Sequence, residues 1–367
     1  MIPEFVHRSP ATKVVFRPGA CAQLGEELAE LGVRRPLVLS GRRTAASPAY
    51  EQSIASLQDF RVFKEIPEHS PVAALEAVTQ LARDHNIDGF VAIGGGSASD
   101  TAKAAALWLA EGGELESHAT RFTPPATLSV PPLNRVKLPI AAVPCTASGA
   151  EVTPGAGIRT PDGRKLIFSD LKLAARLVIL DPAANTAVPA SIMLATGMNG
   201  LAHCIEGLYA KLRTPVTDAL ARHAIELFLE ALPRVAREPG SVEYRGRLLA
   251  AAHLSGRVLV NSRTCLHHAI CHAIGAVTGA AHGESNSVIL PHAMSFNYES
   301  ASQSLSVSRV RELQTELSVP TRLRDIGVPR DSLPIVARKV MGERGLYFNP
   351  RTVKHPDEIQ TLLEAAW

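Results

Sequence analysis

The stretch GFVAIGGGSASDTAKAAAL, residues 89–107, decides the fold that this sequence predicts. An apolar run leads into consecutive glycines, which let a backbone approach a phosphate closely. The residues that follow have helical composition, and a helix N-terminus offers free N–H groups and a partial positive charge. The stretch therefore predicts a strand, a turn and a helix, with a nucleotide phosphate at the turn. The residues expected to contact the nucleotide are Gly94, Gly95, Gly96, Ser97 and Asp100.

The sequence on either side continues the alternation of strands and helices. Apolar runs of strand length flank a helical stretch at 72–86, which predicts an N-terminal α/β region with a doubly wound, Rossmann-like parallel sheet. After residue 182 only helix-periodic stretches follow, so the second half is expected to be all-α. We expect an α/β dinucleotide-binding domain at 1–181 and a helical domain at 182–367. The apolar runs lie at 35–41, 138–146 and 175–182, and helical stretches include 190–210, 217–236, 244–260 and 264–277.

Two further turns are expected at the carboxyl edge of the sheet, where ligands of doubly wound folds bind. In VPCTASGAEVTP, residues 143–154, Thr146 and Ser148 are candidate hydrogen-bond partners of the nucleotide. After the run at 35–41, Arg42 and Arg43 stand where an acidic residue would bind the 2′-hydroxyl of NAD. A guanidinium suits a phosphate monoester, so either NADH or NADPH is acceptable. The alternatives are plain turns and solvated arginines, because the glycines match no standard nucleotide fingerprint.

The second half contains several histidines at spacings that match one turn of a helix. Asn199 and His203 are four residues apart, as are His268 and His272, and His282 follows a glycine-containing stretch. Four-residue spacing places both side chains on one helix face. Imidazoles converging from separate helices suggest a metal site, a proton relay or a cradle for an anionic substrate, and hydrogen-bonded structural histidines are the plain alternative. A metal site of this kind would normally include a carboxylate, whereas Asn199 is an amide.

Composition excludes several classes of partner. A net charge of +3 indicates neither nucleic acid nor a membrane surface. The sequence has no apolar run of membrane-spanning length and no signal-peptide core near its first residue. Its five cysteines form no CxxC pair, which is typical of reduced thiols, so a cytoplasmic location is expected.

These motifs resemble those of the iron-containing (group III) alcohol dehydrogenase superfamily, and most of all its maleylacetate reductase branch. GGGSASDTAK matches the superfamily turn GGGSxxDxAK, and PCTASGAEVT has the shorter spacing of the reductases. GMNGLAHCIEGLYA resembles the reductases' MNAIAHxxEALYA, with Asn199 where the metal enzymes have an aspartate ligand. LHHAICHAIGA, HGESNSVILPHAMSFN and the tail NPRTVKHPDEIQTLLEAAW are also similar to theirs.

The resemblance implies a dehydroquinate synthase-like architecture of two domains, NAD(P)H in the cleft between them, and a homodimer. It maps the superfamily's metal-ligand positions onto Asn199, His203, His268 and His282. We expect this Fe or Zn site to be vestigial and not required, with the histidines supplying positive charge and donors and His272 acting as proton donor. The implied reaction is NAD(P)H-dependent reduction of maleylacetate, or a related unsaturated or oxo dicarboxylate, to 3-oxoadipate in the catabolism of aromatic compounds.

Some residues depart from the reductase pattern. Cys145 replaces a usual threonine, Asp100 is the alcohol-dehydrogenase residue where many reductases have glycine, and 109–137 resembles the alcohol-dehydrogenase insert. One alternative is therefore an alcohol or aldehyde dehydrogenase in which Asn199 still ligates Fe or Zn. Another is a dehydroquinate-synthase-type lyase that uses NAD only within a turnover. The last is a nucleotide-binding relative without activity.

Overall fold

A parallel sheet forms the centre of the first half in the computed structural model, which describes residues 4–124, 127–300 and 305–367. Within those residues the sheet has six strands, and every pairing is parallel. The inner strands are buried along their length, which explains why their sequences are continuously apolar rather than alternating. In spatial order the strands are β1 (Lys13–Phe16), β10 (Leu177–Leu180), β7 (Ile140–Pro144), β4 (Gly89–Gly94), β2 (Pro36–Leu39) and β3 (Arg61–Phe63).

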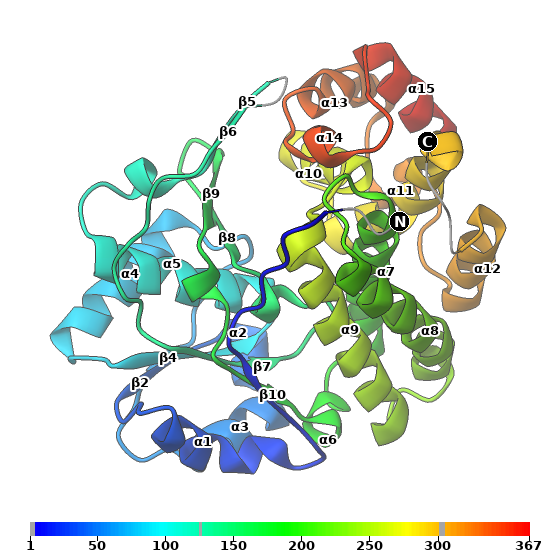
Figure 1. Cartoon of the computed structure of the whole chain (residues 1–367). Coiled ribbons are helices and arrows are strands. Elements are labelled where there is room, and N and C mark those ends of the chain that lie inside the picture. The colour runs from blue at the N-terminus through cyan, green and yellow to red at the C-terminus, as the bar shows by residue number, and fades with distance from the viewer. Residues whose placement is uncertain (1–3, 125–126, 301–304) are drawn as a thin grey trace.

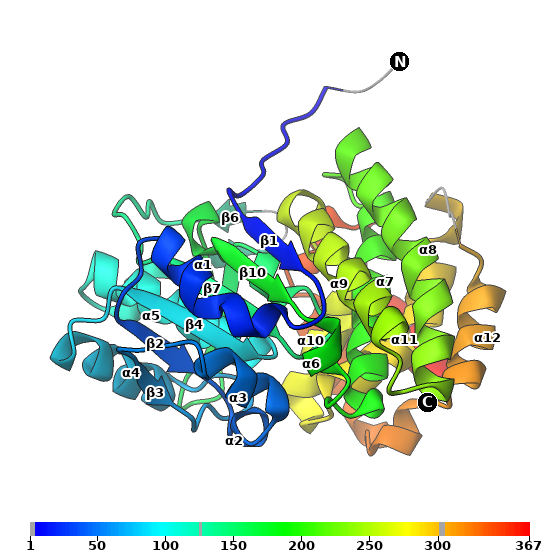
Figure 2. The same ribbon diagram turned by 90° about the horizontal axis from the view of Figure 1, so that it is seen from below.

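Helices cover both faces of this sheet, as Figures 1 and 2 show, so the doubly wound prediction is confirmed. Figure 1 shows α1 and α3 below the sheet and α4 and α5 above it. The helices of this half are α1 (Leu24–Glu30), α2 (Arg42–Ala45), α3 (Pro48–Ile54), α4 (Val72–Asp84), α5 (Gly96–Glu111) and α6 (Pro182–Asn185).

Two antiparallel hairpins extend the first half, and the strand signals of the sequence missed both. β5 (Arg121–Thr123) and β6 (Thr127–Ser129) lie within the insert-like segment 109–137, of which residues 125 and 126 are outside the described residues. β8 (Gly155–Arg159) pairs with β9 (Lys165–Ser169) directly after the turn at 143–154. The second hairpin therefore stands beside the predicted nucleotide site.

Every described element after β10 is helical. Figure 1 shows these helices gathered on one side of the α/β half. Among the described residues, no helix is both long and apolar enough to span a membrane. The α-helices of this half, after α6, are α7 (Ala190–Tyr209), α8 (Pro215–Arg237), α9 (Val242–Ser262), α10 (Leu266–Thr278), α11 (His282–Phe296), α12 (Val307–Leu317), α13 (Leu333–Val340), α14 (Gly345–Phe348) and α15 (Pro356–Ala366).

The two halves are packed tightly where the turn at 143–154 meets the helices. One apolar core runs from the sheet into α7, α8 and α9, and a second lies among α10, α11, α13 and α15. Gly149 has φ +66°, and a Cβ there would lie 2.4 Å from the carbonyl oxygen of Ala252 on α9. Only glycine allows this close approach. The predicted nucleotide turn is therefore held directly against the helical half.

Candidate functional site

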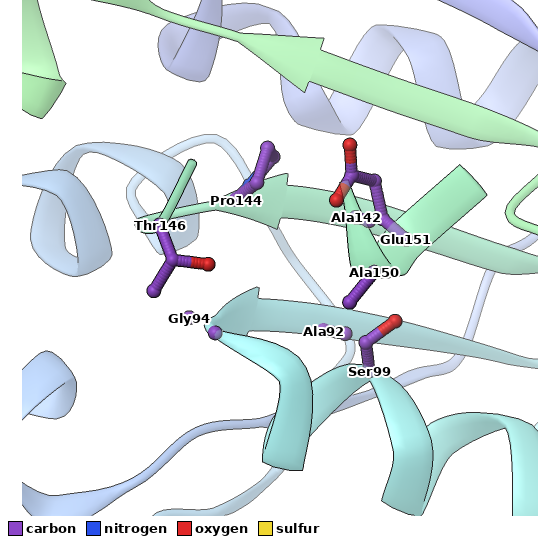
Figure 3. A pocket seen from close by; sticks show the side chains of 9 residues that line it. Ala92, Gly94, Ser99, Ala142, Pro144, Thr146, Ala150 and Glu151 are labelled. Atoms are coloured by element: carbon purple, nitrogen blue, oxygen red, sulfur yellow. The ribbon is translucent and has the colours of Figure 1, made fainter. Parts of the chain in front are cut away.

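The glycine turn and the turn after β7 lie side by side. The Cys145 N–H donates to the Gly94 carbonyl at 2.8 Å, and a Cβ on Gly95 would come within 2.9 Å of Thr146 Cγ2. Between them lies a small pocket, lined by β4 and α5 on one side and by β7 and the following turn on the other (Figure 3). The first N–H groups of α5 have no partner inside the helix, so this arrangement suits a phosphate.

The other predicted nucleotide residues already have partners within the protein. The Ser97 hydroxyl accepts from the His69 backbone N–H at 3.2 Å, and Thr146 and Ser148 share a hydrogen bond of 3.1 Å. Asp100 accepts from the Gly157 N–H at 3.0 Å and so fastens β8 to α5. A contact between Asp100 and the nucleotide stays a prediction. The hydrogen bond to Gly157 gives Asp100 a structural role.

Arg42 and Arg43 lie on α2, at the carboxyl end of β2. Arg42 pairs with Glu65 at 2.9 Å and Arg43 with Glu68 at 2.8 Å, and all four side chains are largely exposed. Exposed pairs of this kind contribute only about 0–1 kcal/mol. Both arginines can therefore exchange these carboxylates for a phosphate at little cost.

Glu151, a buried acid that the sequence analysis did not identify, lines the pocket. Burial raises the pKa of Glu151 to about 7, with the nearby Lys103 charge acting in the opposite direction. The Lys103 ammonium donates to the carbonyl oxygens of Ala150 and Gly155 at 2.5 and 3.1 Å. These hydrogen bonds of Lys103 hold the turn in place.

The histidines predicted from the four-residue spacings do converge. The rings of His203 and His268 stack with centroids 4.7 Å apart, and those of His272 and His282 stack at 5.5 Å. His268 is 6.1 Å from both His272 and His282. Helices α7, α10 and α11 thus bring four imidazoles together. His203 and His268 are buried, His282 is half-buried, and the His272 side chain is 40% exposed, so His272 is the member that solvent reaches most readily.

Glu206, which the sequence analysis did not single out, anchors this cluster. One oxygen lies 2.6 Å from His268 Nδ1, and the other accepts from the His267 backbone N–H at 2.9 Å. Glu206 is fully buried, and burial raises its pKa. The signal was present in the sequence, because Glu206 follows Asn199 by seven residues and His203 by three and so shares their helix face.

The hydrogen bonds define the proton positions on His267 and His268. His267 Nε2 lies 2.9 Å from the Asn286 carbonyl oxygen and must donate, so its Nδ1 is an acceptor. Burial lowers the pKa of His268 to about 3, so His268 is neutral and carries one ring proton. With the proton on Nδ1, His268 donates to Glu206, and Asn199 must turn its amide nitrogen toward Nε2. With the proton on Nε2, His268 donates to Asn199 Oδ1 at 2.9 Å, and Glu206, whose pKa burial raises, must donate to Nδ1.

Burial and mutual repulsion favour the neutral forms of the clustered histidines when no anion is bound, and the positive charge that the resemblance implies for them stays a prediction. Burial first, then the charges of neighbouring histidines, lower the pKa of His203 well below its ordinary value. His272 and His282 are shifted in the same direction by burial, by other histidines and by Lys165. Lys165 stands at the start of β9, on the α/β half, and so faces the cluster from the opposite side. A bound anion would offset both the burial and this repulsion.

The predicted ligand positions differ from the group of described side chains that lie close enough together to share a metal ion. Among the described residues, the group with ligand atoms within 4.8 Å of one another is Glu206, His267 and His268, all engaged in the hydrogen bonds above. The predicted set of Asn199 and three histidines carries no negative charge. His203 Nδ1 is buried and lacks a hydrogen-bond partner in the described chain, whereas a metal-bound histidine ordinarily donates its second N–H to an acceptor.

Comparison with known proteins places these features in a family. The model for iron-containing alcohol dehydrogenase matches residues 11–182, and that for the C-terminal part of the Fe-containing alcohol dehydrogenase family matches 193–307 and 302–367. The maleylacetate reductase of Sphingobium indicum is 31% identical over 375 residues, covering 99% of this chain and 97% of that protein.

Solved structures of similar proteins support the same family. The crystal structure of maleylacetate reductase from Agrobacterium tumefaciens has a TM-score of 0.84 and 27% identity, covering 100% of this chain and 99% of that one. That of a putative alcohol dehydrogenase from Ralstonia eutropha JMP134 has a TM-score of 0.86 and 29% identity, covering 100% and 98%. This NAD(P)-dependent oxidoreductase therefore belongs to the iron-containing alcohol dehydrogenase superfamily, within its maleylacetate reductase branch.

Proposed function

We propose that this enzyme reduces maleylacetate, or a closely related unsaturated or oxo dicarboxylate, to 3-oxoadipate in the catabolism of aromatic compounds, without requiring a metal. The observation that carries the proposal is the pairing of Asn199 with His268 inside a neutral histidine cluster. An amide in place of a carboxylate removes a negative charge, which weakens cation binding and admits an anionic substrate. Lys165, on the facing hairpin, adds positive charge toward the same space.

The cofactor is proposed to bind with its pyrophosphate at the N-terminus of α5. Gly94, Gly95 and Gly96 bring the backbone close, and Thr146 and Ser148 offer hydroxyl groups from the adjoining turn. The support is the N-terminus of α5 beside the pocket in Figure 3, where the first backbone N–H groups have no partner inside the helix. Arg42 would take the 2′-phosphate of NADPH by releasing Glu65.

Bound NAD(P)H supplies the hydride that the β-carbon of the conjugated ketone accepts. The electron pair of the double bond then moves to the ketone oxygen as an enolate, which needs hydrogen-bond donors. His203 and His268 lie on the buried side of the site, with the half-buried His282 beside them. These three histidines become donors when the anionic substrate raises their pKa values. The α-carbon takes a proton, and His272 is the proposed proton donor because solvent can reload it.

The enzyme is also proposed to be a cytoplasmic homodimer without nucleic-acid or membrane partners. β1 is an edge strand that pairs only with β10 in the described sheet, and the segment before it extends from the body in Figure 2. Phe16 of β1 is 50% exposed, and Phe5 and Val6 in the preceding segment are 46% and 76% exposed. An exposed apolar edge is suited to pairing with a second copy. Sedimentation should give the mass of a dimer, and a monomer at micromolar concentration would contradict this.

The function is tested by following NADH and NADPH oxidation with maleylacetate and by identifying the product. One NAD(P)H should be consumed for each 3-oxoadipate formed. Turnover of substrate without net cofactor consumption would instead indicate a dehydroquinate-synthase-type lyase. Absence of any turnover of unsaturated or oxo dicarboxylates would reject the proposal.

A further inference from the structure

Two partly buried arginines lie close together near His272. Arg263 ends α9, and Arg344 precedes α14. Their backbones adjoin, because a Cβ on Gly345 would lie 2.5 Å from the carbonyl oxygen of Cys265. Both side chains are partly buried, and each lies within range of the other's charge. Arg8, whose backbone N–H donates to Asn261 Oδ1 at 2.8 Å, adds a third positive charge near Arg263.

Neither guanidinium has a hydrogen bond or an ion pair to any described residue. The buried Arg245, by contrast, has hydrogen-bond acceptors within the protein. Arg245 donates to the carbonyl oxygens of Pro239, Asn185 and Val188 at 2.9, 3.2 and 2.9 Å. Two partly buried cations without acceptors are unfavourable unless a ligand supplies the acceptors.

The backbone at Arg263 is also unusual. Its φ is +67° with ψ 174°, a region that residues other than glycine rarely adopt. Such conformations concentrate at ligand sites, where the surrounding structure maintains them. The sequence retains a bulky arginine where glycine would be relaxed, which indicates that the guanidinium has a use.

The position of the pair relative to the cluster fits a small dicarboxylate. The charge of Arg344 reaches His272, and the neighbouring Glu343 carboxylate lies 3.9 Å from His272 Nδ1. Glu343 is the acidic group on this side, and Arg344, Arg263 and Lys165 outnumber it. Arg344 therefore lies next to His272, at the solvent-exposed end of the histidine site, and Arg263 lies next to Arg344.

We infer that Arg263 and Arg344 bind one carboxylate of a dicarboxylic substrate while its reacting double bond lies at the histidine cluster. The inference rests on the proposed function and adds the residues that select a substrate with two carboxylates over one with a single carboxylate. A carboxylate would receive paired N–H donors from a guanidinium, the geometry for which arginine is suited.

The test compares adipate with hexanoate, which has the same carbon chain but one carboxylate. Binding of each to the full chain is measured by calorimetry for the wild type, Arg344→Gln and Arg263→Gly. Glycine readily adopts a positive φ at position 263, so loss of binding by the Arg263→Gly variant cannot be attributed to backbone strain. Arg247→Gln, an exposed arginine of α9 paired with Glu230 and Glu243, serves as the matched control.

The wild type should bind adipate at least about tenfold more tightly than hexanoate, and each arginine variant should lose about 10- to 100-fold for adipate alone. Arg247→Gln should change neither affinity. Equal binding of the two acids by the wild type, or equal loss of both acids in the variants, would overturn the inference. Because binding needs no turnover, adipate selectivity without maleylacetate reduction would reject only the proposed function. Maleylacetate reduction with an unchanged KM in both variants would reject only the arginine pocket.

Discussion

Whether the histidine site binds a metal is proposed to depend on Asn199. The amide can pair with either neutral form of His268, because it offers both an N–H donor and a carbonyl acceptor to Nε2. A carboxylate at this position could not donate. The same atom of His268 would then be available to a cation or would have to gain a proton.

Asn199→Asp should therefore increase bound Fe or Zn and lower kcat/KM for maleylacetate by at least about tenfold, because it adds a negative charge where an anion must bind. Metal content by plasma emission and steady-state kinetics measure the two effects. Asn199→Ala is the control, since it removes the hydrogen bond without adding charge and should gain no metal. A metal-free Asp variant with wild-type kinetics would show that Asn199 does not decide this chemistry.

His267 gives the stability of the site a defined pH dependence. Burial, followed by the charge of His268, lowers the pKa of His267 to about 4, against about 6.5 in the unfolded chain. The unfolded chain thus binds the proton first, so this contribution to stability falls as the pH drops from about 6.5 toward 4. At a pH of about 5 the loss is about 2 kcal/mol.

His267→Gln keeps an N–H for the Asn286 carbonyl but does not titrate. The difference in unfolding free energy between wild type and variant should therefore shift by about 2 kcal/mol between neutral pH and pH of about 5, to the disadvantage of the wild type. Denaturant titrations at the two pH values measure it. A difference that stays constant with pH would mean that His267 is not buried in its neutral form.

The α5 turn can be tested apart from the stability of the fold. A Cβ on Gly96 would meet Ala150 Cβ at 3.8 Å, an ordinary contact, whereas one on Gly95 would crowd Thr146. Gly96→Val should fold normally yet weaken NAD(P)H binding at least about tenfold, because its side chain stands at the helix N-terminus. Gly240→Val, where nothing lies within 4 Å, is the matched control. Near-native affinity in a fluorescence titration of folded Gly96→Val would contradict this placement.

Elements with a strong periodic signal could be predicted from the sequence, and short or locally paired ones could not. The strand and helix of 89–107 appear as β4 and α5, and 72–86 contains α4. β3 has three residues on the sheet edge, and β8 is rich in glycine, so neither has a clear apolar pattern. The histidine cluster was found through the regular spacing within α7 and α10. Lys165 and Arg344 reach it from separate elements and carry no motif, so only the folded chain reveals them.

The whole molecule places each requirement of the reaction on a different part of the fold. The sheet and α5 provide the cofactor turn, and α7, α10 and α11 provide the imidazoles. Gly149, pressed against α9, joins the two parts at the nucleotide turn. The proposed cofactor and substrate residues are therefore held in one packed arrangement.

The proposed reaction reduces an unsaturated or oxo dicarboxylate without a metal. It is tested by measuring NAD(P)H oxidation by enzyme dialysed against a chelator, with maleylacetate and with simple aldehydes as substrates. Activity with maleylacetate should survive dialysis largely unchanged and should exceed activity with aldehydes. Loss of activity on dialysis, its return with Fe²⁺ or Zn²⁺, and a preference for aldehydes would contradict it and identify a metal-dependent alcohol dehydrogenase.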